Sequence, residues 1–393
     1  MSIPQKTALI LAGGGARAAY QVGVLKALAE ILPRRMQTPF PIICGTSAGA
    51  FNAVTLAVYA QSFKLGTQFL EKMWKNFTAH DIYRADALGV FKNTALWLSG
   101  LILNGFGFNK LNRVSLLDSS PLAALLERSM PSEKIQENID VGVLHALSIS
   151  ASGYSTGQSV NFFQSVQGMP TWKRARRLGI ATNIEAKHIL ASSAIPFIFP
   201  AVRINREYFG DGSMRQIAPI SPALHLGATR ILVIGTGQTS EINPARNKKE
   251  AEEENYPSLA KIAGHALDSI FLDSLEVDLE RLQRINKTMA LLPEEMRQLV
   301  NMHHVDVMLI SPSQSIEKIA GRHASHLPWP IKLLLSSVGA MRRNAANLVS
   351  YLLFEKGFCR ALIDLGYQDA MQKKEDILAF LSVSPEAEPD EAA

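Results

Sequence analysis

The chain has 393 residues, of which 47% are hydrophobic and 19% charged, and its net charge is +5 from 40 Lys and Arg against 35 Asp and Glu. This length suits one large domain or a domain with a substantial appendage. Two cysteines, Cys44 and Cys359, are too few for a disulfide framework, and the sequence has neither zinc-ligand spacing nor a basic, aromatic-rich nucleic-acid surface. We therefore expect no metal, no cofactor and no nucleic-acid partner.

The first predicted element is a buried strand over residues 7–12, which ends at three consecutive glycines, 13–15. A helix with one apolar face follows over 17–32. A second strand over 40–44 leads through another glycine turn into an apolar helix over 50–60. Two successive strand–turn–helix units predict an α/β sheet with helices on its faces.

Further along, two strand-like runs at 147–151 and 160–163 flank a glycine-containing turn, which predicts a hairpin at the margin of the sheet. Residues 186–193 favour a helix that ends before a proline. Apolar runs at 230–235 and 305–310 predict two more buried strands.

The segment 241–256 is rich in Asn, Lys and Glu and is expected to be an exposed loop. Leucine spacing over 267–282 predicts a long amphipathic helix, and the pattern remains helical beyond the last strand. We expect a catalytic α/β domain over 5–312, a helical C-terminal lobe over 313–380 and a disordered tail over 381–393.

Membrane insertion is not expected. The N-terminus lacks the features of a signal peptide. The longest apolar-looking stretch, 88–108, contains Lys92, Asn93 and several glycines and falls short of a transmembrane helix. We expect a cytoplasmic protein with peripheral contact to the inner face of a membrane, because a mild basic excess favours anionic headgroups.

The run Gly-Thr-Ser-Ala-Gly at 45–49 has the pattern of a nucleophile elbow, with Ser47 as the nucleophile. Gly45 and Gly49 leave room for a sharp turn, and the N-terminus of the following helix favours negative charge on the attacking oxygen. A tight turn without chemistry is the alternative for this motif alone.

The glycines at 13–15 fit neither a dinucleotide fingerprint nor a P-loop. Their exposed backbone N–H groups would form an oxyanion hole beside an elbow serine. Asp211, between two glycines, is either a turn former or the base that such a serine needs. The rival base is His225, which preserves the nucleophile–acid–base order of α/β-hydrolases.

Together these motifs resemble the patatin-like phospholipase family. The matching runs, in chain order, are Gly-Gly-Gly-Ala-Arg at 13–17, Tyr-Gln-Val-Gly-Val-Leu at 20–25, Gly-Thr-Ser-Ala-Gly at 45–49, Ala-Ser-Ser-Ala-Ile-Pro-Phe-Ile-Phe-Pro at 191–200 and Asp-Gly at 211–212. Two positions depart from the family pattern, since Ala18 stands where Gly is frequent and Ser213 where Gly or Ala is.

The resemblance implies a three-layer α/β/α fold with a mostly parallel central sheet and, in this chain, a helical C-terminal extension. It also implies a Ser47–Asp211 dyad that cleaves fatty-acyl esters of phospholipids or other acyl lipids through an acyl-enzyme, as a phospholipase A or lysophospholipase does. An Asp acts as base without a histidine only where its surroundings raise its pKa. The implied oxyanion hole comprises Gly13, Gly14, Gly15 and Arg17.

Two other functions stay open: a soluble carboxylesterase or thioesterase with a Ser–His–Asp triad, and a catalytically silent lipid-binding protein. For contact with lipid, the aromatic-rich segment 90–108 is the first candidate and 329–335 the second. A buried helix pair is the alternative for the first of these. The densest basic cluster, 172–177, would meet headgroups or form a solvated loop.

Overall fold

The computed structural model describes residues 6–33, 36–105, 115–238, 258–293, 296, 303–337, 339–340 and 346–382. The strands are β1 Thr7–Leu11, β2 Ile42–Thr46, β3 Ala146–Gly153, β4 Ser159–Ser165, β5 Trp172–Arg174, β6 Arg177–Ala181, β7 Val202–Ile204, β8 Glu207–Asp211, β9 Arg230–Ile234 and β10 Asp306–Ile310. The predicted loop at 241–256 and the tail beyond 382 lie outside the described residues.

The α-helices are α1 Ala19–Ile31, α2 Ala48–Val58, α3 Phe63–Asn76, α4 Ala79–Ile82, α5 Ala87–Gly105, α6 Ser120–Ser129, α7 Glu133–Asp140, α8 Ala186–Ser192, α9 Ser221–His225, α11 Leu259–Asp268, α12 Ser274–Leu291, α14 Ile316–His323, α15 Trp329–Ser337, α16 Ala346–Leu352, α17 Lys356–Gln372 and α18 Lys374–Leu381. Shorter turns of helix are η1 Gly15–Ala18, η2 Gly212–Arg215 and η4 Ala324–His326, and η3 Ser269–Asp273 is a π-helical turn that joins α11 to α12.

Within the described residues, the strands form one sheet in the order β10-β9-β1-β2-β3-β4-β6-β5. Neighbours from β10 to β3 run parallel, whereas β3 and β4 are antiparallel. The strand β8 pairs with β3 as well as with β7. The half of the sheet that carries both glycine turns is therefore wholly parallel, and the carboxyl ends of its strands meet at one edge.

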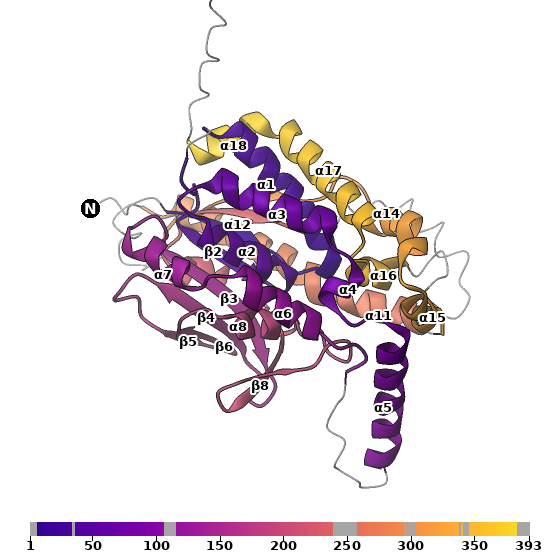
Figure 1. Ribbon diagram of the computed structural model, residues 1–393. Coiled ribbons are helices and arrows are strands. Elements are labelled where there is room, and N and C mark those ends of the chain that lie inside the picture. The colour runs from indigo at the N-terminus through magenta and orange to yellow at the C-terminus, as the bar shows by residue number, and fades with distance from the viewer. Residues whose placement is uncertain are drawn as a thin grey trace, which may run out of the picture.

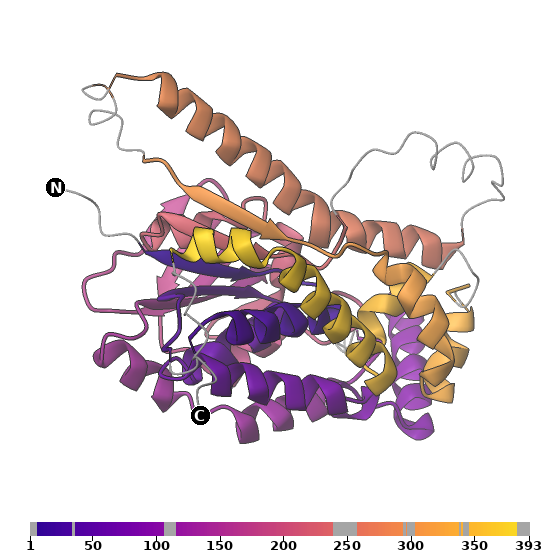
Figure 2. The same ribbon diagram turned by 90° about the horizontal axis from the view of Figure 1, so that it is seen from above.

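Alternate side chains of β1 enter two separate cores, because successive residues of a strand point to opposite faces. Leu9 and Leu11 belong to a large core shared with α1, α2, α3 and α17. Ala8 and Ile10 belong to a smaller core shared with α9 and α12. Figure 2 shows α12 on one side of the sheet and α1 with α17 on the other. The three-layer α/β/α fold with its mostly parallel central sheet is confirmed.

The predicted elements at 7–12, 40–44, 50–60 and 186–193 correspond to β1, β2, α2 and α8. The hairpin β3–β4 is also present, but its predicted place at the sheet margin is wrong, because β6 and β5 lie beyond β4. The basic cluster at 172–177 is exposed over 173–176, as in the solvated alternative, but it forms β5 and the turn into β6 rather than a loop. Exposed charges of this kind protect the edge of a sheet from pairing with another chain.

The helices after β10 pack onto the α/β layers, as Figure 1 shows for α17 along α1. Leu362 and Ile363 of α17 are buried in the same core as α1. The Tyr20 hydroxyl donates a 3.0 Å hydrogen bond to Asp369 of α17. The expected helical C-terminal extension is present, and it shares its core with the sheet.

The helix α5, which contains most of the predicted lipid-contact segment, projects from the body of the protein (Figure 1). Leu88 and Phe91 at its base are 84% and 50% exposed, and the Phe91 ring lies 6.2 Å from that of Trp329 in α15. Phe106 and Phe108 lie outside the described residues. In the described part of the chain, no helix combines the length and apolar character needed to cross a bilayer.

Candidate active site

Ser47 stands at the junction of β2 and α2, in a turn that few residue types tolerate. Its φ of 55° and ψ of −130° are a strained combination for a residue with a side chain. Its N–H donates a 2.8 Å hydrogen bond to the Ser192 hydroxyl, and its side chain is buried. A Cβ atom at Gly49 would lie 2.3 Å from the Leu11 carbonyl oxygen, so only glycine lets α2 begin this close to β1.

Asp211 is the last residue of β8, and the strand register brings it to Ser47. The strand β4 occupies one edge of β3, so β2 and β8 share the other edge. Thr46 pairs with Ser150, and Asp211 pairs with the next residue of β3, Ala151. The carboxyl ends of β2 and β8 therefore meet head to head.

Burial raises the pKa of Asp211 from 3.8 to about 6, and contacts with the Ser47 hydroxyl and with Ser213 moderate that rise. One carboxylate oxygen, Oδ1, accepts the Ser213 N–H at 2.9 Å. The other, Oδ2, has no full hydrogen bond from the described residues, so the Ser47 contact is long or poorly aligned. Catalytic hydrogen bonds often have this geometry before substrate binds.

The glycine turn between β1 and η1 lies beside Ser47, and Gly15 lines the same pocket. The Gly13 carbonyl accepts a 2.5 Å hydrogen bond from the Thr236 hydroxyl, which fixes the start of the turn. The N–H groups of Gly14 and Gly15 donate to no acceptor in the described part of the chain. Both N–H groups are therefore unengaged within the described residues.

Arg17, expected in the oxyanion hole, is buried and engaged elsewhere. Its Nε donates to the Ser350 hydroxyl at 2.7 Å. Its Nη1 and Nη2 form ion pairs with Asp268 at 3.4 Å and Glu317 at 3.0 Å. The guanidinium is therefore held by the C-terminal helices, and Arg17 is not among the residues that line the pocket beside Ser47.

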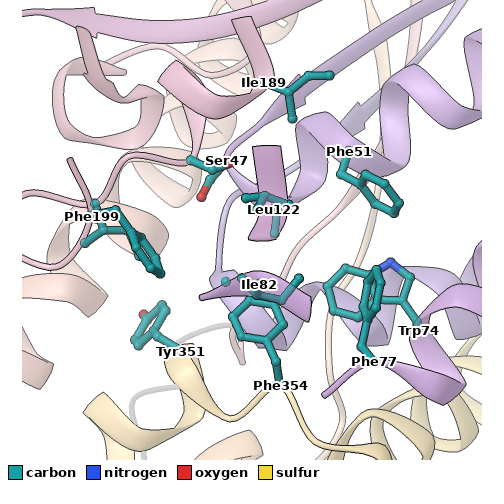
Figure 3. A pocket seen from close by; sticks show the side chains of 14 residues that line it. Ser47, Phe51, Trp74, Phe77, Ile82, Leu122, Ile189, Phe199, Tyr351 and Phe354 are labelled. Carbon is teal, nitrogen blue, oxygen red and sulfur yellow. The ribbon is translucent and has the colours of Figure 1, made fainter. Parts of the chain in front are cut away.

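The pocket beside Ser47 is narrow, with about 40 Å³ of space that a water-sized molecule can enter. In Figure 3, Ser47 and Phe199 lie on one side of it and Phe51, Trp74 and Phe77 on the other. Its lining is mostly aromatic and aliphatic: Gly15, Ser47, Ala48, Phe51, Trp74, Phe77, Ile82, Leu122, Ile189, Ser193, Ile195, Phe199, Tyr351 and Phe354. An apolar lining of this kind favours an apolar group over a polar one beside the serine.

His225, the rival base, lies outside this set of lining residues. Its ring stacks on Trp172 with 4.9 Å between centroids, and its Nδ1 lies 2.8 Å from the Ser221 carbonyl oxygen. Burial lowers the pKa of His225. The geometry therefore favours Asp211 over His225 as the partner of Ser47.

Three supporting residues carry no motif signal that reveals their contacts. Ser192 accepts from the Ser47 backbone, Thr236 holds the glycine turn, and Gln216 accepts a 3.0 Å hydrogen bond from the Thr46 hydroxyl. Ser192 lies inside the run 191–200, so the sequence marks the segment without giving its role. Thr236 follows β9, the neighbour of β1, which is a weaker signal.

Comparisons with known proteins agree with these motifs. A sequence model described as patatin-like phospholipase matches residues 9–224. A cGAMP-activated phospholipase from Pseudomonas aeruginosa is 28% identical over 244 residues, which are 60% of this chain and 63% of that relative. The chain thus matches less than two thirds of the relative's length.

Two solved structures are also similar, each at 15% identity. VipD from Legionella pneumophila has a TM-score of 0.38, with 95% of this chain and 67% of VipD covered. ExoU from Pseudomonas aeruginosa, in complex with SpcU, has a TM-score of 0.26, with 99% of this chain and 83% of the other covered.

Proposed function

The chain belongs to the patatin-like phospholipase family, and from this premise we propose that it hydrolyses fatty-acyl esters of phospholipids or lysophospholipids with Ser47 and Asp211 as a dyad. The observation that carries the proposal is the meeting of β2 and β8 on one edge of β3, which brings the two residues together, with Ser47 on the wall of an apolar pocket.

In the acylation step, the Ser47 hydroxyl attacks the ester carbonyl while Asp211 accepts its proton. A base with a pKa of about 6 is ionised at neutral pH and still basic enough to take part in proton transfer. The negative charge that develops on the carbonyl oxygen is met by the N–H groups of Gly14 and Gly15. The alcohol of the lipid then departs with the proton from Asp211, and the acyl group stays on Ser47.

Deacylation reverses these roles with water in place of the alcohol. Asp211 accepts a proton from the water, which attacks the acyl carbonyl in the same oxyanion site. The fatty acid leaves when the proton returns to Ser47. No metal or cofactor takes part in this sequence of steps.

The substrate class follows from the pocket beside the serine. Its walls are rings and branched side chains, which favour a hydrocarbon chain over a polar acyl group. We further propose that α5 and α15 contact the lipid surface, because Leu88, Phe91, Trp329 and Leu333 are each at least half exposed.

The test is a panel of phospholipids, lysophospholipids, neutral esters and thioesters, with released fatty acid measured by mass spectrometry. Ser47→Ala is expected to abolish release and labelling by a fluorophosphonate probe. Ser193→Ala is the matched control, because Ser193 lines the same pocket and is expected to leave both intact. No release from any substrate, or labelling that persists in Ser47→Ala, would reject the proposal.

A further inference from the structure

The guanidinium of Arg17 is surrounded by five residues from the C-terminal half of the chain, which we call the Arg17 clamp. They are Asp268 of α11, Glu317 of α14 and three residues of α16: Asn347, Ser350 and Tyr351. The Arg17 side chain is 0% exposed. Because an arginine stays charged even when it is buried, the folded protein needs these partners to offset the cost of removing the charge from water.

Hydrogen bonds engage Nε and Nη2 of Arg17, whereas Nη1 makes only the ion pair with Asp268 and has no hydrogen bond from the described residues. Besides the two ion pairs and the bond to Ser350, Nη2 donates to the amide oxygen of Asn347. The Tyr351 ring lies under the guanidinium, with its centroid 4.0 Å from Cζ. Rigid planar recognition of this kind fixes the position of an arginine as well as its charge.

The clamp residues also hold one another. Asp268 accepts hydrogen bonds from the Tyr351 hydroxyl at 2.8 Å and from the Asn347 amide. The Ser350 hydroxyl donates to the Asn347 carbonyl at 2.6 Å. Because these bonds join α11 to α16, and Glu317 adds α14, the position of Arg17 is set by three helices at once.

Arg17 in turn is joined to the glycine turn. Its own N–H donates a 3.1 Å hydrogen bond to the Gly14 carbonyl. Gly15 has a φ of 55°, and a Cβ atom there would lie 2.3 Å from the Tyr351 carbonyl oxygen. The helix α16 therefore touches the turn directly at Gly15 and indirectly through Arg17.

We propose that the Arg17 clamp makes the C-terminal helices part of the catalytic machinery, with Arg17 as a positioning residue rather than an oxyanion donor. The clamp holds the turn so that the N–H groups of Gly14 and Gly15 face the acyl carbonyl. This inference rests on the proposed function. Stability alone is a weak reason for such a cluster, since well-packed apolar residues often stabilise a core equally well.

A matched ion pair elsewhere in the fold separates positioning from stability. Lys26 of α1 and Glu71 of α3 lie 3.1 Å apart and are partly buried, without contact to the glycine turn. Glu317→Gln and Glu71→Gln are both expected to lower the unfolding midpoint, Glu317→Gln by more because Arg17 is fully buried. Only Glu317→Gln is expected to lower kcat, by ten- to a hundredfold with KM within about twofold, since misplacing an oxyanion donor acts on the transition state.

Asp268→Asn is expected to act as Glu317→Gln does, and Asp268→Glu, which restores the charge, is expected to recover part of the lost kcat. A kcat that stays within about twofold of wild type in Glu317→Gln and Asp268→Asn would overturn the inference. So would an equal loss of kcat in Glu71→Gln.

Hydrogen–deuterium exchange of the segment 12–18 tests the positioning without any turnover. Exchange there is expected to be faster in Glu317→Gln than in wild type and unchanged in Glu71→Gln. If wild type hydrolyses no lipid, the proposed function fails while the exchange result still decides whether the clamp holds the turn. If exchange in the segment 12–18 is the same in Glu317→Gln as in wild type, the inference is overturned even where the wild-type protein hydrolyses lipid.

Discussion

Replacing Asp211 by Asn is expected to abolish turnover and, at the same time, to stabilise the folded protein above pH 6. The carboxyl group is buried, and its pKa is raised from 3.8 to about 6, mainly by desolvation. Between pH 4 and pH 6 the folded protein keeps a proton that the unfolded chain has released, so the free energy of unfolding falls as the pH rises. An asparagine at this position does not ionise, so the variant does not show this fall in the free energy of unfolding.

The magnitude follows from the shift in pKa. About two units at roughly 1.4 kcal/mol per unit give a penalty of about 3 kcal/mol at pH 8, and about half of that at pH 5, where the folded carboxyl is still largely protonated. Asn also keeps an oxygen for the Ser213 N–H. The gain of Asp211→Asn over wild type should therefore grow with pH and level off above pH 7.

The assay is urea unfolding of both proteins at half-unit steps from pH 5 to pH 8.5. Asp364→Asn, an exposed change in α17, is the control and should give no gain that depends on pH. If the difference in the free energy of unfolding between Asp211→Asn and wild type is constant across this range, the inference that Asp211 is buried with a raised pKa is refuted. A destabilised Asp211→Asn with unchanged turnover would refute its assignment as the base.

Four further outcomes follow from the structure. The value of kcat/KM for wild type should rise about tenfold per pH unit below pH 6 and level off above it, as Asp211 ionises; a flat profile contradicts this. Ser192→Ala removes the acceptor of the nucleophile's N–H and should lower kcat roughly tenfold in a steady-state assay, whereas unchanged kcat contradicts the role. His225→Ala should keep at least half of the wild-type turnover, whereas complete loss of turnover would support the Ser–His–Asp triad instead. Leu88→Asp should weaken cosedimentation with anionic liposomes while turnover of a soluble short-chain ester stays unchanged, with the equally exposed Leu291→Asp as control; equal binding by both contradicts contact through α5.

The strands and helices of the first sixty residues could be predicted because their signals are local. An unbroken apolar run that ends in glycines marks a buried strand and its turn, and β1, β2 and α2 all follow this rule. The strand β8 gives no such signal. Its residues, Glu207 to Asp211, neither alternate nor form an apolar run, and the strand exists because it pairs with β3, more than fifty residues earlier in the chain.

The same distinction explains the site. Ser47 and the glycine turn could be recognised from short runs, because steric limits on a sharp turn act between neighbours. The environment of Arg17 could not be predicted from the sequence, because its partners Asp268, Glu317 and Ser350 lie hundreds of residues later in the chain. From the sequence alone, an arginine in such a motif is expected to donate hydrogen bonds to the ligand. Only the fold shows that carboxylates of distant residues already pair with its guanidinium.

One short segment gives the proposed dyad a means to act without a histidine. A carboxylate that must take the proton directly needs to be held against the serine within a few tenths of an ångström, since no third residue can adjust the distance. Ser192 accepts the N–H of Ser47, and two residues later the Ala194 carbonyl accepts the N–H of Asp211 at 2.8 Å. The backbones of Ser47 and Asp211 are thus both tied to the same three residues, 192–194. The strain at Ser47 and the burial of Asp211 persist because this segment fixes the two together.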